Sequence, residues 1–256
     1  MGLGTRKNID EALYWYHEAA IRGSSRAKSN YACLLEKQDK YYEAFTWLEE
    51  AAREGYVQAK LRLGCLYIMG KGVDKNIKKG YEIIREAAEG GSPGAQHLMG
   101  VYNQFGLNIP DGSGVKINLE EAEKWYNKAI KQNYILSKSA LALLWAEKGI
   151  NLDEAKNIAE EAVRKYPQVG SCSDALGWVL FKQGNYKEAV IQLEKASSLS
   201  LKDPIVLDHL AETYLKLHDE DRAKEQWRKA IELNPSGNLK EKIKAKLDVL
   251  ENASTK

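Results

Sequence analysis

The chain has 256 residues, of which 44% are apolar and 29% are charged, and its formal net charge is +2. Such a composition is typical of a soluble protein with a sizeable interior, and so small a charge gives no reason to expect nucleic acid or an anionic membrane as a partner. The sequence contains no apolar run of roughly 18 residues and no signal-peptide core, so we expect a soluble chain without a membrane span, in a compartment that the sequence does not specify.

Pairs of small residues divide the chain into repeated segments. The pairs, each with members seven positions apart, are Ala12/Ala19, Ala44/Ala51, Gly80/Ala87, Ala122/Ala129, Ala155/Ala162, Ala189/Ala196 and Ala223/Ala230. Successive pairs are offset by 32, 36, 42, 33, 34 and 34 residues. Small residues at this spacing share one stripe of a helix and allow a neighbouring helix to approach to about 8 to 9 Å. A period in this range is typical of stacked helical hairpins, each touching only its neighbours, so the sequence predicts an all-α solenoid.

The expected helices follow from these pairs in chain order. A lone second helix is expected near residues 8–22, six full hairpins from about 26 to 234, and a last helix near 237–251. One apolar stripe runs along the last helix, the pattern of a helix that covers the end of a stack, and it consists of Leu239, Ile243, Leu247 and Leu250. Because Gly2 falls in a loop between two helices of the repeat, we expect the chain to be a piece of a longer protein, with any export signal upstream.

A glycine-rich loop precedes three of the expected second helices. The pattern GxGxxxN occurs as Gly2, Gly4 and Asn8, as Gly70, Gly72 and Asn76, and as Gly112, Gly114 and Asn118. Glycine supplies the positive φ of a tight turn, and an asparagine side chain can cap the following helix, so we expect the loops to be architectural. Two of the helices continue into an aromatic doublet, Trp15 with Tyr16 and Trp125 with Tyr126.

These residues resemble the Sel-one-like repeat, and the best copy consists of Ala59, Leu63, Gly64, Tyr67, Gly70, Gly72, Val73 and residues 87–91. From about residue 136 the period is 34, and the small residues with the prolines at 167, 204 and 235 resemble the tetratricopeptide repeat. We therefore expect Sel-one-like repeats in residues 1–135, with an incomplete first unit, three tetratricopeptide-like repeats in 136–235, and a capping helix with its tail in 236–256. The first of the three units is less regular, because Leu143 occupies the small-residue position that Gly177 and Ala211 occupy in the second and third units. Both resemblances imply a right-handed superhelix of antiparallel hairpins.

No catalytic or metal-binding constellation is predicted. Residues 90–94 read GxSxG, the nucleophile elbow of α/β-hydrolases, but that motif needs a strand before the turn, and a helix is expected here. The histidines are scattered at positions 17, 97, 209 and 218, and Cys33, Cys65 and Cys172 lie far apart, which we interpret as buried free thiols. We therefore expect a protein that is not an enzyme and holds no metal and no cofactor.

The tetratricopeptide resemblance implies that the first helix of each hairpin lines a concave inner wall. The implied wall positions are Ala140, Leu144, Glu147 and Lys148, then Asp174, Trp178, Phe181 and Lys182, then Asp208, Glu212, Leu215 and Lys216. Among these, we expect partner contacts from Leu144, Lys148, Asp174, Trp178, Phe181, Lys182, Asp208, Glu212 and Lys216. The positions that match the carboxylate clamp of some tetratricopeptide domains are Ala140, Leu144, Ala175, Ile205 and His209, and they lack its lysines, asparagines and arginine, which disfavours that mode of recognition.

Two interpretations stay open for parts of this wall. Lys148, Lys182 and Lys216 recur at the 34-residue period and are expected to form a row, which either attracts an acidic segment or places each cation at a helix C-terminus. Trp178 and Phe181 either contact a ligand or pack between adjacent units.

The resemblance to both families implies a non-enzymatic scaffold or adaptor that binds a peptide or protein segment on its concave face. Two alternatives remain open: the chain is the targeting or regulatory arm of a longer enzyme whose catalytic domain lies outside it, or it is a structural module that self-associates. The sequence does not specify the partner, the organism or the oligomeric state.

Overall fold

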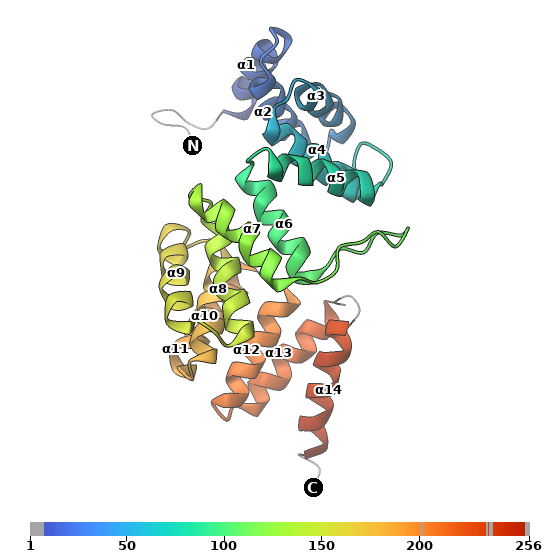
Figure 1. Cartoon of the computed structure of the whole chain (residues 1–256). Coiled ribbons are helices and arrows are strands. Elements are labelled where there is room, and N and C mark those ends of the chain that lie inside the picture. The colour runs from blue at the N-terminus through green and yellow to red at the C-terminus, as the bar shows by residue number, and fades with distance from the viewer. Residues whose placement is uncertain (1–7, 201, 234, 236–237, 254–256) are drawn as a thin grey trace. The chain divides into compact units, whose positions relative to one another are not determined.

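The computed structural model of this chain describes residues 8–200, 202–233, 235 and 238–253, and these fold almost entirely into helices (Figure 1). The described residues contain fourteen helices, and their extended pairing is limited to one isolated bridge. The bounds are α1 Ile9–Ile21, α2 Ser25–Glu36, α3 Tyr41–Arg53, α4 Val57–Met69, α5 Ile77–Glu89, α6 Pro93–Phe105, α7 Leu119–Lys131, α8 Leu136–Lys148, α9 Leu152–Lys165, α10 Gly170–Lys182, α11 Tyr186–Leu199, α12 Pro204–Lys216, α13 Glu220–Glu232 and α14 Asn238–Ala253. The predicted all-α repeat solenoid is confirmed: a lone second helix, six hairpins and a last helix follow one another.

The helices form two compact units. One, here called the N-terminal unit, is Met1–Tyr134, and the other, the C-terminal unit, is Ile135–Lys256. Within each unit a helix packs against its partner in the same hairpin and against helices of the next hairpin. None of the helices in the described ranges is long and apolar enough to cross a membrane.

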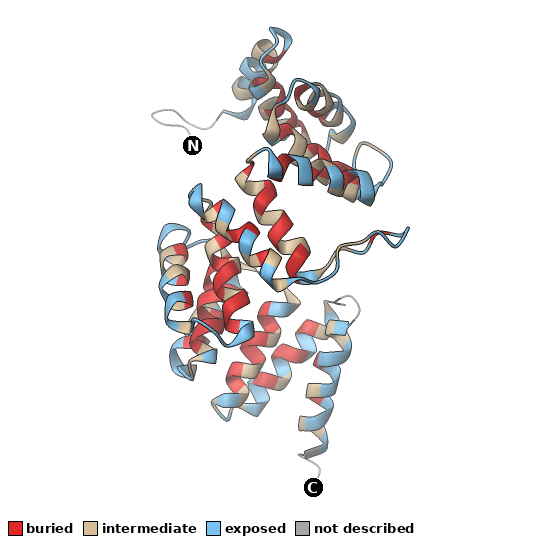
Figure 2. Cartoon of the chain, viewed as in Figure 1, coloured by how far each residue is buried: buried red, intermediate tan, exposed pale blue. Residues whose placement is uncertain are grey.

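The predicted small-residue pairs lie at the helix contacts. In α3, α5, α7, α9, α11 and α13 both members of each pair are buried, and the buried stripes of these helices are visible in Figure 2. One close approach joins α4 to α5, where a Cβ on Gly64 would come within 2.7 Å of the backbone oxygen of Gly80. Glycine at these two positions therefore lets the backbones of the hairpin touch.

The exception is α1, where Ala12 and Ala19 are only half-buried. The aromatic doublet shows the same difference, because Trp15 is 61% exposed whereas Trp125 is 8% exposed. Tyr126, the second member of the later doublet, packs against Gly100 of α6, the first helix of its own hairpin. Residues 1–7, including Gly2 and Gly4 of the first loop, lie outside the described ones.

The asparagines of the GxGxxxN loops cap the helices that follow them, as predicted. The side chains of Asn8, Asn76 and Asn118 accept hydrogen bonds from the backbone N–H three residues on, at 2.9 to 3.0 Å. Gly70 adopts a left-handed conformation at the end of α4, with φ +68°. Ser92, the serine of the GxSxG string, is the N-cap of α6 and follows helix α5, so the string is an inter-repeat turn.

A polar contact between the two helices of a hairpin also recurs. Lys28 binds Glu54, and Lys60 binds Glu86, and both pairs are 26 residues apart. In the third hairpin Gln132 donates a hydrogen bond to Gln96, 36 residues away. In the loop between α6 and α7, Leu107 and Val115 exchange two backbone hydrogen bonds, and Asp111 forms an ion pair with Lys78 at 3.0 Å.

The last helix packs on the end of the C-terminal unit. The side chains of Ile243 and Leu247 on α14 are buried in a core with Trp227 of α13, and Leu239 and Leu250 pack against its edge. Since α14 follows a second helix, it covers α12 and α13 as a further first helix would.

Candidate functional site

Two first helices of the C-terminal unit, α10 and α12, are joined by a stack of rings. Helix α10 packs against both α8 and α12. The indole of Trp178 lies on the imidazole of His209, with ring centroids 3.9 Å apart and planes 14° apart, and on the ring of Phe181 at 4.6 Å. The ammonium of Lys182 lies 4.8 Å from the centroid of the indole ring. Trp178 is 4% exposed, so its ring packs between adjacent repeats.

Charges surround this stack on three helices. His209 Nδ1 lies 2.8 Å from Asp174 Oδ1, and both side chains are 8% exposed. Burial by itself lowers the pKa of His209, but the charge and hydrogen bond of Asp174, with Glu147 and Asp208 nearby, outweigh it and raise that pKa above its ordinary value. The imidazolium therefore donates to Asp174, while the indole N–H of Trp178 donates to Glu147 of α8.

A second polar cluster joins α12 to the capping helix. Lys246 Nζ lies 2.8 Å from both carboxylate oxygens of Asp208 and 2.5 Å from Glu212. The indole N–H of Trp227 donates to Asp208 as well, at 2.8 Å. Burial opposes the charge of Lys246, but hydrogen bonds to Asp208 and Glu212 raise the pKa of the ammonium overall. Both predicted wall carboxylates of α12 therefore already bind a cation of the same chain.

The residues predicted to contact a partner differ in their exposure. Leu144, Asp174 and Trp178 are buried, Phe181, Asp208 and Glu212 are half-buried, and Lys148, Lys182 and Lys216 are exposed. The three lysines occupy the last turns of α8, α10 and α12, where a cation interacts favourably with the helix dipole. Of the nine residues, the three lysines are the most accessible to a ligand, and Phe181, Asp208 and Glu212 are accessible in part.

Sequence reasoning confined the wall to the C-terminal unit and missed a cavity in the N-terminal unit. This cavity has a volume of about 450 Å³ and is lined by α2, α4 and α6, the first helices of three consecutive hairpins, together with Tyr134. The same repeat pattern that placed the C-terminal wall, applied to α4 and α6, would have identified these helices as its lining.

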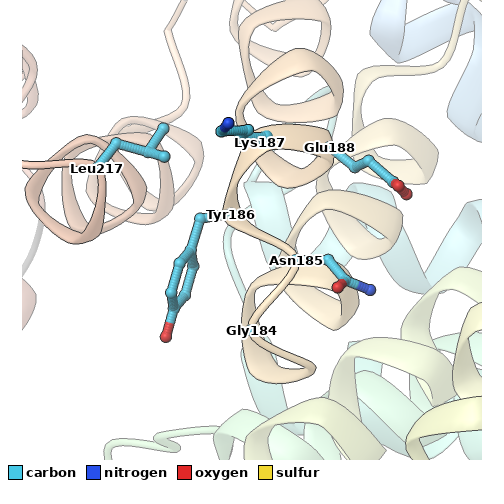
Figure 3. Close-up of a pocket in the computed structure, with 6 residues that line it drawn as sticks. All are labelled: Gly184, Asn185, Tyr186, Lys187, Glu188 and Leu217. Atoms are coloured by element: carbon cyan, nitrogen blue, oxygen red, sulfur yellow. The ribbon is translucent and has the colours of Figure 1, made fainter.

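A second hollow, of about 350 Å³, lies where α10 turns into α11. Figure 3 shows that Lys187 points toward Leu217 whereas Asn185 and Glu188 point to the other side of the turn. Because the polar groups do not converge on one point, this hollow offers no chemical site.

The cysteines are free, but the expectation that all are buried is wrong for two of them. Cys172 is buried and lies 3.3 Å from the hydroxyl of Ser139, whereas Cys33 and Cys65 are half-buried. Burial raises the pKa of the Cys172 and Cys65 thiols, so both are held in the unreactive protonated form. Among the described residues, no group of three or more His, Cys, Asp or Glu side chains is placed to hold a metal ion.

Comparison with family models identifies both kinds of repeat. The model described as Sel1 repeat matches residues 1–24, 34–56, 57–92 and 93–134. Two models described as tetratricopeptide repeat match residues 169–200 and 206–236. The resemblances stated from the sequence are therefore confirmed, and the matches cover the second and third of the three expected tetratricopeptide units. No curated protein matches the chain in sequence.

Several solved structures have a similar architecture. A Sel1 repeat protein from Oxalobacter formigenes is 26% identical, with a TM-score of 0.58 over 80% of this chain and 82% of that one. The protein c5321, a protective antigen of uropathogenic Escherichia coli with an SLR fold, is 22% identical, with a TM-score of 0.56 over 90% of this chain. A chain of the APC/C hetero-tetramer Cut9-Hcn1 is 14% identical, with a TM-score of 0.66 over 94% of this chain. This chain spans 50% of the Escherichia coli protein and 46% of the APC/C chain.

Proposed function

We propose that this chain, which carries Sel1 repeats within residues 1–134 and tetratricopeptide repeats within residues 169–236, is a non-catalytic scaffold that binds a segment of a partner protein along the inner helices of its hairpins. Repeats of both families are interaction modules that bind proteins. In the C-terminal unit the inner helices are α8, α10 and α12, and the segment lies against the exposed lysines at their ends.

One observation carries this proposal. The stack of Trp178 and Phe181 of α10 with His209 of α12 joins these two first helices, and the indole N–H of Trp178 adds α8 by donating to Glu147. Trp178, His209 and Asp174 are buried, so a ligand does not reach these three side chains. A wall that is held by its own buried contacts keeps the exposed side chains on it in place before a partner arrives. Less conformational entropy is then lost on binding.

Two features of the chain that could suggest catalysis, the GxSxG string and the cysteine thiols, are explained by the fold. The GxSxG string is a helix cap rather than a nucleophile elbow, since helix α5 precedes Ser92. The thiols of Cys65 and Cys172 have raised pKa values, which makes them poor nucleophiles. Neither feature supports chemistry in this chain.

Two charge-reversal variants test the proposal. The Lys182→Glu, Lys216→Glu double variant changes the inner helices, and the Lys165→Glu, Lys187→Glu double variant makes the same change of charge on exposed lysines of the outer helices α9 and α11. Immobilised protein captures partners from a lysate of the native host, and mass spectrometry identifies what each variant retains. We expect the inner variant alone to lose a specific partner, with unchanged far-UV circular dichroism.

A photo-crosslinking residue placed at position 182 or 187 gives an independent measurement. Crosslinks to the captured partner from position 182 and not from 187 support binding along the inner helices. If both double variants capture the same proteins as the wild type, or if the outer variant alone loses them, the proposed surface is wrong.

A further inference from the structure

The cavity of the N-terminal unit has the size and lining of a site for a side chain of another molecule. Its volume of about 450 Å³ lies within the range of ligand pockets, roughly 300 to 1,000 Å³. Apolar walls come from Leu61 and Leu98, and Met69 stands at its rim with 51% of its surface exposed. Methionine adapts to differently shaped apolar groups, which suits the edge of a binding site.

A glycine keeps this space open. A Cβ placed on Gly94 of α6 would come within 2.8 Å of the Leu61 side chain of α4 and 3.9 Å of the hydroxyl of Tyr134. A larger side chain at position 94 would therefore extend into the cavity between these two neighbours. Gly94 thus offers a single position at which the cavity can be filled.

Two titratable groups of the cavity, His97 and Cys65, are neutral at pH 7. Burial lowers the pKa of His97 to about 4, and burial also raises the pKa of the Cys65 thiol. The charged lining residues are Arg62 and Glu36, whose closest N–O distance is 3.4 Å. This is long for a charge-assisted hydrogen bond, so the pair binds weakly.

The charges on the three lining helices favour an acidic partner. Helices α2, α4 and α6 carry Arg26, Lys28, Lys60 and Arg62 against one acidic residue, Glu36. Lys28 and Lys60 bind glutamates of the outer helices, which leaves Arg62 as the cation that lines the cavity. Its side chain is 38% exposed, and a guanidinium has five N–H donors, of which those on Nη1 face Glu36.

We propose that this cavity receives a large apolar side chain from an acidic segment of a partner protein, with a carboxylate next to that side chain binding Arg62. The inference rests on the proposed function, because it names the chemistry of a partner segment and places a second contact on the inner helices of the N-terminal unit. The apolar side chain contributes burial against Leu61, Leu98 and Met69, and the carboxylate selects the segment by its charge.

A peptide titration tests the proposal. The probe is the blocked peptide Ac-Gly-Ser-Asp-Leu-Phe-Glu-Ser-Gly-NH2, followed through the methyl signals of labelled leucine and methionine in the intact chain. We expect shifts at Leu61, Leu98 and Met69, binding about tenfold weaker when lysines replace the two acidic residues, and no binding when serines replace the leucine and phenylalanine.

Three variants complete the test. Gly94→Leu is expected to abolish binding by filling the cavity, and Arg62→Gln is expected to bind the acidic and the lysine peptides alike, whereas Arg26→Gln on an exposed position of α2 retains the preference. Far-UV circular dichroism checks that each variant is folded, and Arg62→Gln keeps the test valid should Gly94→Leu not fold.

The outcomes separate this inference from the proposed function. Shifts outside the cavity, equal affinity of the wild type for the acidic and lysine peptides, no binding at millimolar peptide, or an Arg62→Gln variant that keeps the preference would each overturn the inference. Failure of the proposed function shows instead in the capture experiment, which changes only residues of the C-terminal unit.

Discussion

Replacing Asp174 by asparagine is expected to reverse the pH dependence that His209 confers on the stability of the C-terminal unit. In the wild type the folded-state pKa of His209 is raised above its unfolded value, near 6.5. The stabilisation from this group is therefore fully present below pH 6.5 and is lost as the pH rises through the folded-state pKa. The Asp174→Asn variant keeps the burial, which lowers the pKa, and loses the charge that opposes it. Its stability should therefore rise as the pH rises through 6.5.

The size of the effect follows from the burial of the pair. Both side chains are 8% exposed, and breaking a buried ion pair by removing one partner costs about 3 to 5 kcal/mol when the other partner stays charged. Above the folded-state pKa the imidazole is neutral, and an asparagine can still hydrogen-bond it, so the cost should fall to about 1 kcal/mol. The difference between wild type and variant should therefore shrink by roughly 2 to 4 kcal/mol from acidic to alkaline pH.

Urea unfolding at pH 5.5, 7.0 and 8.5, monitored by far-UV circular dichroism and tryptophan fluorescence, measures this difference. The imidazole proton signals of His209 report its pKa in the folded state. Glu147→Gln is the matched control, because it retains an acceptor for the Trp178 indole and removes a charge that makes no hydrogen bond to His209. Its effect on the pH dependence of stability should therefore have the same sign as that of Asp174→Asn and be smaller. A free-energy difference between Asp174→Asn and wild type that stays constant with pH would refute the reasoning.

Three further substitutions test the packing and the caps, each by urea unfolding. Ile243→Ala in the capping helix should cost about 2 to 5 kcal/mol because the side chain is fully buried, whereas Val249→Ala, at a position 69% exposed, should change stability by less than about 0.5 kcal/mol. Asn76→Ala removes an N-cap and should cost about 1 kcal/mol, and Asn76→Asp should restore most of it. Gly100→Ala places a methyl group 2.3 Å from the Tyr126 ring and should cost about 1 to 3 kcal/mol, so an unchanged midpoint would mean that the contact is looser than described.

The helices and their hairpin pairing were predictable because their signals are local. Asn76 and Asn118 cap the helices that follow them by accepting a hydrogen bond from the N–H three residues on, and the pair Ala189/Ala196 marks the contact stripe within a single helix. The repeat period then stacks the units, since each hairpin can cover its apolar side only with the next one. The composition of a short segment and its spacing to the next copy are therefore enough to predict the helices and their pairing into hairpins.

The state of the inner wall depends on contacts between repeats. The 34-residue period places Trp178 on an inner helix, but its ring is buried because His209, one repeat later, stacks on it. Asp208 stands at the matching position one repeat after Asp174, yet its charge is bound by Lys246 of the capping helix, whose contacts no repeat pattern specifies.

Tertiary contacts also decide the roles of the residues at the cavity and in the aromatic doublet. Nothing in the sequence around Gly94 distinguishes a glycine that keeps a space open from one that permits a turn, because the difference lies in the distance to Leu61 of another helix. Trp15 and Trp125 occupy one motif, and the first is exposed while the second is buried. The sequence by itself determined the repeats, the helices and their caps, while tertiary structure alone decided which side chains a partner can reach, because exposure is a property of the neighbours that a residue acquires on folding.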